Sequence, residues 1–164
     1  MEIQTPPQGD PRVTEFMVAD PPTLSPTDSV MAAARMLIDS GLPGLPVLED
    51  SRLVGLLTET NLISQEAEVE TPSSLGILDA LFSFDIGRHF DDEMRAVLAT
   101  TVEGLMTTRV TTVLPEATLT QVATVMADRH INPVPVVDRD GRLIGIVSRR
   151  DVVRMVAALD ERTE

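Results

Sequence analysis

Ser148 and Asp151 have the side-chain types and the spacing best suited to ligand chemistry in this sequence. They lie three residues apart, where the aliphatic run from Leu143 to Val147 gives way to a helix-like stretch beginning at Arg149. On the first turn of a helix, this spacing brings both side chains close to the exposed N-terminal amides. An ionised carboxylate can accept hydrogen bonds from two adjacent sugar hydroxyls, and the serine hydroxyl can add another.

Two guanidinium groups follow the serine directly. Arg149 and Arg150 could reach a phosphate near the start of the helix, where the free amides already favour an anion. A simpler interpretation is open as well, because Ser and Asp at such a junction often serve only as helix caps. The residue types therefore predict either a sugar-phosphate site or a capped helix.

The elements that must position these side chains form a β-hairpin. Two short runs rich in β-branched residues, Val134 to Val137 and Leu143 to Val147, flank a turn of Asp, Arg, Asp and Gly. This pattern predicts a hairpin in which Gly141 takes the left-handed conformation. Residues 46–61 repeat the same pattern with a turn that is one residue shorter, so the chain contains an internal duplication.

The duplication continues upstream of the hairpins at a constant offset of 89 residues, which pairs Met17 with Met106 and Pro26 with Pro115. Each copy predicts the order strand, helix, strand, strand, helix, a mixed α/β (α+β) fold. In the first copy we expect a strand at Thr23–Leu24, a helix from Asp28 or Ser29 to Ser40 with Val30, Ala33, Ala34, Leu37 and Ile38 on its apolar face, and a helix starting near Glu59. In the second copy we expect a strand at Val110–Val113, a helix capped by Thr118 and ending near His130, and a last helix from Arg149 to about Leu159.

This pattern resembles the CBS domain, and two copies in one chain resemble a tandem CBS pair, the Bateman module. The resemblance is carried by residues 105–115 (LMTTRVTTVLP), 132–138 (NPVPVVD), 141–148 (GRLIGIVS) and 148–151 (SRRD). It implies two repeats that pack through their sheets with pseudo-twofold symmetry and enclose two clefts. The expected divisions are a flexible N-terminus (1–13), a first repeat (14–65), a linker with inserted helices (66–102), a second repeat (103–158) and a C-terminal tail (159–164).

The resemblance also implies a ligand, because family members commonly bind adenosine nucleotides in these clefts. The base would lie against Val113, Ile131, Val134 and Pro135, and backbone groups around Asn132 would read its edge. Pro133 offers no amide hydrogen for that purpose. The expected nucleotide site comprises Thr112, Val113, Ile131, Asn132, Pro133, Val134, Pro135, Ser148, Arg149, Arg150 and Asp151.

The first copy departs from this pattern at its own junction. There Asn61 stands where the second copy has Asp151, and the residues around it are acidic rather than basic. An amide oxygen makes weaker hydrogen bonds than a carboxylate, and nearby acids repel phosphate. We therefore expect a second, weaker cleft, formed by Thr23, Pro43, Gly44, Leu45, Thr58 and Asn61.

Composition narrows the class of partner. The formal net charge is -13, and residues 1–104 carry all of this excess, with 18 acidic residues and five Arg. Nucleic acid is not expected as a partner, because backbone binding requires a strongly basic face. The chain contains no Cys, has no basic and apolar leader at its start, and lacks an apolar run of about 18 residues. These features predict a soluble cytoplasmic protein without disulfides or a membrane span.

No constellation typical of catalysis emerges, so an enzyme is not expected. His89 to Glu93 contains metal-capable side chains, but they are consecutive and point in different directions, and no metal site is predicted. Phe82, Phe84 and Phe90 cluster in the linker, where either packing or a partner surface would explain them. The sequence predicts a stand-alone regulatory module that binds AMP, ADP or ATP, requires no cofactor, senses cellular energy, forms a homodimer and acts on a target protein. The alternative is a dimerisation scaffold that binds no ligand.

Overall fold

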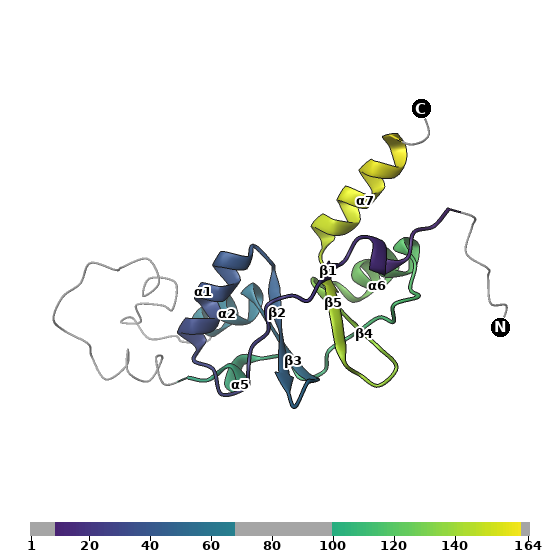
Figure 1. Ribbon diagram of the computed structural model, residues 1–164. Coiled ribbons are helices and arrows are strands. Elements are labelled where there is room, and N and C mark those ends of the chain that lie inside the picture. Colours follow the sequence, from purple (N-terminus) through teal and green to yellow (C-terminus); the bar gives the residue numbers. More distant parts are fainter. Residues whose placement is uncertain (1–8, 68–99, 162–164) are drawn as a thin grey trace. The chain divides into compact units, whose positions relative to one another are not determined.

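The computed structural model describes residues 9–67 and 100–161 (Figure 1). These residues form two compact units. Unit 1 contains the described residues 9–21 and 111–161, and unit 2 contains the described residues 22–67 and 100–110. The expected helices within 66–102 and the Phe82, Phe84 and Phe90 cluster fall almost wholly in residues 68–99, outside the described residues.

In unit 2, helix α1 (Val30–Ser40) has the ends that its sequence predicts. Ser29 Oγ accepts a hydrogen bond from the Ala32 amide at 3.1 Å and so caps the first turn. Gly41 closes the helix in the left-handed conformation, with a φ of 65°. Val30, Ala33, Ala34 and Leu37 are buried as expected, but the prediction for Ile38 is wrong. Its side chain is 65% exposed, because it lies at the rim of the apolar stripe.

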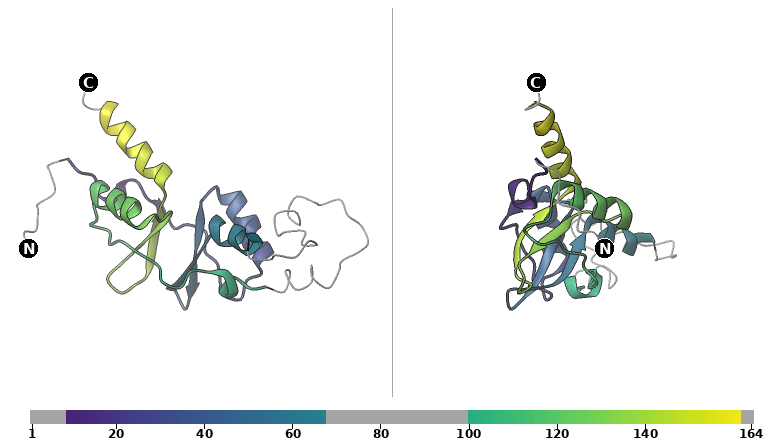
Figure 2. Two further views of the ribbon diagram at one scale, coloured as in Figure 1. Left: turned by 180° about the vertical axis from the view of Figure 1, so that it is seen from behind. Right: turned by 90° about the vertical axis from the view of Figure 1, so that its right-hand side faces the viewer.

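The hairpin of unit 2 is formed by β2 (Gly44–Glu49) and β3 (Arg52–Thr58), and α2 (Glu59–Ala67) follows directly. The turn residues Asp50 and Ser51 both have positive φ, as a two-residue type I′ hairpin turn requires. Figures 1 and 2 show α1 and α2 on the same side of this hairpin. The expected strand at Thr23–Leu24 is reduced to a single bridge between Leu24 and Val47.

A segment that follows residues 68–99 completes unit 2. Helix α5 (Val102–Leu105) leads into Thr107, whose amide and carbonyl both pair with Leu56 of β3. Gly55, next to Leu56, faces Met106, and a Cβ on this glycine would overlap the methionine sulfur. The edge of β3 is therefore covered by a residue that the sequence analysis assigned to the second repeat.

Unit 1 has the corresponding elements: α6 (Leu119–Arg129), β4 (Val134–Val137), β5 (Leu143–Val147) and α7 (Arg149–Glu161). Thr118 caps α6 in a capping box with Gln121. Gly141 has a φ of 79°, which confirms the left-handed position predicted for the hairpin turn. Figure 1 shows α7 leaving the end of β5, beside α6.

The third strand of this sheet comes from the start of the chain. Strand β1 (Val18–Ala19) pairs antiparallel with β5, so that Val18 lies opposite Ile146 and Ala19 opposite Gly145. Met17 fits against Gly145, where a Cβ would overlap the methionine sulfur and lie 3.0 Å from the Val18 carbonyl oxygen. Each hairpin is thus completed by a segment from the start of the other predicted repeat.

Residues just before β1 are also held in unit 1. The expected flexible terminus included Pro11 to Val13, yet the Val13 amide donates to the Ala117 carbonyl at 2.7 Å and the Pro11 carbonyl accepts from the Leu119 amide at 2.8 Å. The 3-10 helix η1 (Val13–Glu15) begins here, and Val13 is fully buried. Burial of apolar surface holds this segment in place, because Val13 belongs to one core cluster with Val122, Met126, Val134, Val136 and Val147.

These elements confirm the mixed helix-and-strand fold class. The expected strand at Val110–Val113 is wrong in extent, since only Val113 makes a bridge, to Val136. The repeat boundaries and the packing of one repeat on the other stay predictions. Across the described residues, no helix combines the length and the apolar character that crossing a membrane requires.

Candidate functional site

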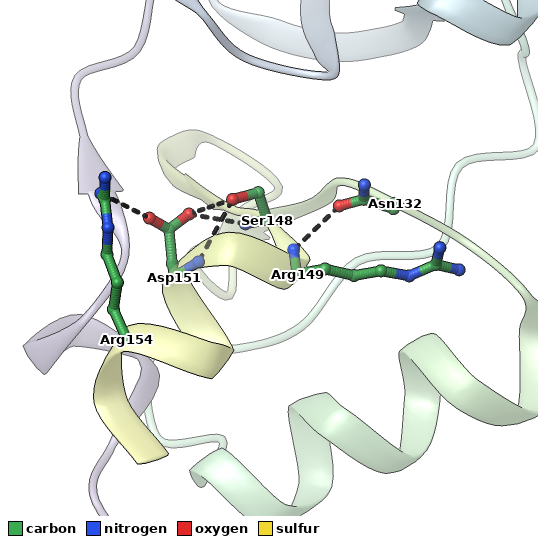
Figure 3. Close-up of polar contacts among 5 residues, drawn as sticks. All are labelled: Asn132, Ser148, Arg149, Asp151 and Arg154. Carbon is green, nitrogen blue, oxygen red and sulfur yellow. Dashed lines mark hydrogen bonds and ion pairs between the residues drawn. The ribbon is translucent and has the colours of Figure 1, made fainter. Parts of the chain in front are cut away.

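Ser148 and Asp151 form a closed hydrogen-bonded pair at the junction of β5 and α7 (Figure 3). One carboxylate oxygen, Oδ2, accepts from the Ser148 amide at 2.8 Å and from the Ser148 hydroxyl at 2.6 Å. The Asp151 amide in turn donates to Ser148 Oγ at 3.3 Å. Both side chains are more than nine-tenths buried. Since two hydrogen bonds use the acceptor capacity of Oδ2, the other oxygen, Oδ1, is the part of the carboxylate left for a ligand.

The next amide of the helix start also has a partner within the unit. The Arg149 N–H donates to Asn132 Oδ1 at 3.0 Å, which links the loop before β4 to the first turn of α7. The helix N-terminus is therefore largely capped by the side chains of Ser148, Asp151 and Asn132. An anion approaching this end would meet fewer free amides than the sequence suggests.

Oδ1 of Asp151 faces a different guanidinium from the ones predicted. Arg154 Nη1 lies 3.9 Å from Oδ1, one helical turn along α7, in a loose ion pair between an exposed guanidinium and a buried carboxylate. Figure 3 shows Arg154 on the Oδ1 side of Asp151, whereas the Arg149 side chain runs away from Asp151 on the Asn132 side. The predicted sugar-binding and phosphate-binding groups Asp151 and Arg149 thus diverge in this unit.

Asp151 and Arg154 both line an open pocket. It has a volume of about 440 Å³ and is bounded by the segment before β1 and by one face of α7. The walls are mostly apolar, and charged groups occur at Glu15, Asp151 and Arg154. The lining residues are Glu15, Phe16, Met17, Val18, Asp151, Arg154, Met155 and Ala158.

The residues predicted to hold the base have varied positions in unit 1. Val134 is fully buried in the core and Pro133 and Pro135 are buried, whereas Ile131 and Asn132 are half-buried. Val113 and Ile131 pack against the same core cluster. Thr112, Arg149 and Arg150 are exposed. Their common role in binding a nucleotide stays a prediction.

In unit 2 the corresponding junction repeats the local geometry but changes its chemistry. Asn61 Oδ1 accepts from the Thr58 amide at 2.9 Å and from the Thr58 hydroxyl at 2.8 Å, as Asp151 Oδ2 does with Ser148. The second arm of Asn61 is an NH₂ group, which donates to Thr107 Oγ1 at 3.3 Å. This position therefore presents a donor that already has a partner, in place of a charged acceptor.

The other residues of the expected second cleft differ in their burial and in their contacts with this junction. The Glu59 amide donates to the Pro43 carbonyl at 3.1 Å, so a backbone group replaces the side-chain cap that Asn132 provides in unit 1. Gly44 and Leu45 are buried in β2, and Thr23 is exposed. A weaker second site at these residues stays a prediction.

Asp151 is the one pocket residue that belongs to the site expected from the sequence; the other seven were not predicted. The spacing of Asp151 and Arg154, three apart on a predicted helix, is a signal that could have paired them. Phe16, Met17 and Val18 carried no such signal, because their place beside α7 depends on β1 pairing with β5, far away in the sequence. Within the described ranges, no group of three or more His, Asp or Glu side chains is arranged to hold a metal ion.

The fold and the two junctions define a duplicated α/β protein in which each repeat ends in a hairpin, a capped turn and a helix. The family model described as CBS domain matches residues 13–68 and 102–158. The chain belongs to the CBS domain family, as a tandem pair.

Solved structures and curated relatives agree with this assignment. CBSX2 of Arabidopsis thaliana in complex with AMP is 28% identical, with a TM-score of 0.68, and the match covers 91% of this chain and 98% of that one. The CBS domain pair of MJ0100, in complex with 5-methylthioadenosine and S-adenosyl-L-methionine, has a TM-score of 0.67 at 24% identity over 91% and 98% of the two chains, and it bears on the fold.

Among the curated relatives, inosine-5'-monophosphate dehydrogenase of Korarchaeum cryptofilum is 31% identical over 86% of this chain but over only 23% of its own length. The chain spans from 23% to 76% of the first curated relatives that it matches. CBS pairs are thus found both as small proteins and as parts of larger enzymes.

Proposed function

We propose that this chain is a stand-alone regulatory module that binds an adenosine-containing nucleotide beside Asp151 and transmits the binding as a conformational change. The observation that carries the proposal is that the two oxygens of the Asp151 carboxylate have different surroundings. Oδ2 is committed to Ser148, while Oδ1 accepts no hydrogen bond from the described residues and faces Arg154, which lines a pocket together with Asp151. A charged acceptor held in one orientation can bind ribose hydroxyls without further ordering.

The AMP complex of CBSX2 supports the choice of ligand class, because that protein has the same fold over nearly its whole length. We infer that AMP, ADP or ATP is the natural ligand and that the module responds to cellular energy through it. The chain carries out no reaction of its own in this proposal, and it needs no cofactor. A cytoplasmic location and a target protein, regulated by the ligand-bound form, complete the proposal.

The coupling between ligand and target has a physical limit. A ligand shifts a conformational equilibrium only by the difference between its binding free energies for the two states. Binding of the nucleotide must therefore depend on the same conformation that the target recognises. Reciprocally, the target protein would tighten nucleotide binding by the same factor.

A second function, dimerisation as a scaffold, is favoured by the exposed apolar residues of α7. Val153 is 66% exposed and Val156 is 53% exposed, one turn apart on the same helix. We propose that a second copy of the chain covers them in a homodimer. Sedimentation of the wild-type chain and of a Val153→Glu, Val156→Glu variant would test this, and equal masses at all concentrations would remove the dimer from the proposal.

A thermal-shift panel of AMP, ADP, ATP, NAD, S-adenosylmethionine and GTP distinguishes the two functions. At about a hundred times its dissociation constant, a ligand of the folded state should stabilise it by ~2.7 kcal/mol. We expect stabilisation by at least one adenine nucleotide and none by GTP. If no member of the panel changes the melting temperature, the ligand-free scaffold is the better account. A hydrolysis assay on the same nucleotides should detect no product.

A further inference from the structure

The open pocket beside Asp151 is large enough to hold a small molecule. Its volume of about 440 Å³ falls within the range of ~300–1,000 Å³ that ligand pockets occupy in proteins. Phe16, Met17, Val18 and Met155 supply apolar wall, and the charged groups stand among them. Apolar walls with a few fixed polar groups suit a flat heterocycle attached to a polar sugar.

The orientation of the carboxylate connects this pocket to the proposed ligand. Oδ1 is on the side of Asp151 that faces Arg154, and both residues line the pocket (Figure 3). Oδ2 points the other way, into its bonds with Ser148. A sugar held by Oδ1 must therefore lie on the pocket side of Asp151.

Arg154 is the cation best placed to meet such a ligand. Of the eight described residues that line the pocket, it is the one with a positive charge. Its side chain is 70% exposed, and its ion pair with Asp151 is loose at 3.9 Å, so rotation toward a bound anion costs little. Arg149 extends in the opposite direction, and neither it nor Arg150 borders the pocket.

We infer that the nucleoside occupies this pocket and that Arg154, rather than Arg149 or Arg150, contacts the phosphate attached to the sugar. This inference rests on the proposed function and names the group within the site that recognises the anion. Arg154 then determines whether the module prefers a phosphorylated adenosine over adenosine itself. Glu15 adds a negative charge to the pocket wall, and its Oε1 is held by the Arg12 amide at 2.9 Å. Because Glu15 repels each further negative charge, the site favours a monophosphate over a triphosphate.

Calorimetric titration with AMP and with adenosine tests the inference directly. In the Arg154→Gln variant, the affinity for AMP should fall about ten- to a hundredfold, while the affinity for adenosine should change by less than about threefold. Arg142→Gln removes the same charge at the opposite end of β5, outside the pocket, and should leave both affinities as they are in the wild type.

Other results would contradict either the proposed function or the assignment of Arg154. If wild-type protein binds neither compound, the proposed function fails and this inference fails with it. If AMP binds equally well to wild type and Arg154→Gln, or if Arg149→Gln or Arg150→Gln causes the loss instead, the proposed function stands and the assignment of Arg154 is wrong.

A second variant tests the pocket itself. Ala158 lies on the half-exposed face of α7 that borders the pocket, so Ala158→Trp would fill space there without entering the core. We expect this variant to lose at least tenfold in affinity for both AMP and adenosine while keeping the wild-type circular dichroism spectrum. Normal binding of both compounds by folded Ala158→Trp would place the ligand elsewhere and overturn the inference.

Discussion

Asp151 and Asn61 occupy corresponding positions in the two repeats and use one side-chain oxygen in the same way. Each accepts two hydrogen bonds from the amide and hydroxyl of the residue three before it, Ser148 or Thr58. They differ in the other terminal group of the side chain. In Asp151 this group is an acceptor oxygen near Arg154, and in Asn61 it is an NH₂ group hydrogen-bonded to Thr107. The cap is thus common to both repeats, and the free acceptor belongs to the second alone.

Asp151→Asn should separate these two roles. The amide can keep the cap as Asn61 does, so we expect a loss of no more than about 1 kcal/mol in the free energy of unfolding, from the weaker dipole and hydrogen-bond terms. The affinity for an adenine nucleotide should fall about ten- to a hundredfold, because Oδ1 becomes a donor. Urea denaturation and calorimetric titration measure the two effects. A fully stable variant with unchanged affinity would show that Oδ1 does not bind the ligand.

The reverse substitution, Asn61→Asp, should destabilise unit 2. It deletes the hydrogen bond from Nδ2 to Thr107 Oγ1, and the new carboxylate oxygen regains a partner there only through rotation of the Thr107 hydroxyl into a donor orientation at 3.3 Å. We expect a loss of about 0.5–1.5 kcal/mol in the free energy of unfolding, measured by urea denaturation.

Thr107→Val supplies the control for this bond. In the Thr107→Val background, Asn61→Asp should cost measurably less than in the wild type, because its partner is already absent. Equal costs in both backgrounds would mean that the 3.3 Å contact contributes nothing to stability.

Ser148→Ala should weaken the start of α7. The variant loses the hydroxyl that donates to Asp151 and accepts from its amide. We expect about 0.5–2 kcal/mol of destabilisation in thermal or urea unfolding, with Ser148→Thr close to the wild type because threonine keeps the hydroxyl, as Thr58 does in the first repeat. If alanine and threonine variants unfold alike, the hydroxyl plays no part in the cap.

Gly145→Ala tests the attachment of β1. The new methyl group would collide with Met17 and approach the Val18 carbonyl, so β1 must shift away from β5. A cost of about 1–3 kcal/mol in the free energy of unfolding follows for such overpacking. In a Met17→Ala background the same substitution should cost less, and denaturation of the four proteins in this cycle gives the difference. Gly55→Ala with Met106→Ala is the matched experiment in unit 2.

The elements that local signals specify could be predicted from the sequence. Ser29 and Thr118 at the starts of α1 and α6, and Gly41 at the end of α1, act through bonds to neighbours a few residues away. The hairpin turn at Gly141 has the same local origin. The pairing of β1 with β5 could not be predicted, because Val18 and Ala19 form a strand too short to show a pattern and their partners lie at the other end of the chain.

The site was predictable in part for a similar reason. The spacing of Ser148 and Asp151 predicts their contact, but spacing cannot decide between a cap and a ligand site, and the structure assigns one carboxylate oxygen to the cap. The directions of Arg149 and Arg154 depend on what surrounds α7, including Asn132 and the segment before β1, so spacing alone could not show which guanidinium lies nearest to Asp151.

The polypeptide passes from unit 1 to unit 2 after Pro21 and returns after Val110. Just before each crossing, a short segment pairs with the hairpin of the unit that the chain is leaving: β1 pairs with β5, and Thr107 bridges to Leu56 of β3. Splitting the gene between the repeats would therefore produce two halves that each carry the strand the other needs. Mixed together, such halves should reassemble by trading segments, while either half alone would keep an open sheet edge that attracts further copies. A single-repeat ancestor would have faced the same exposed edge, and exchange between two identical molecules would have closed it before duplication joined them into one chain.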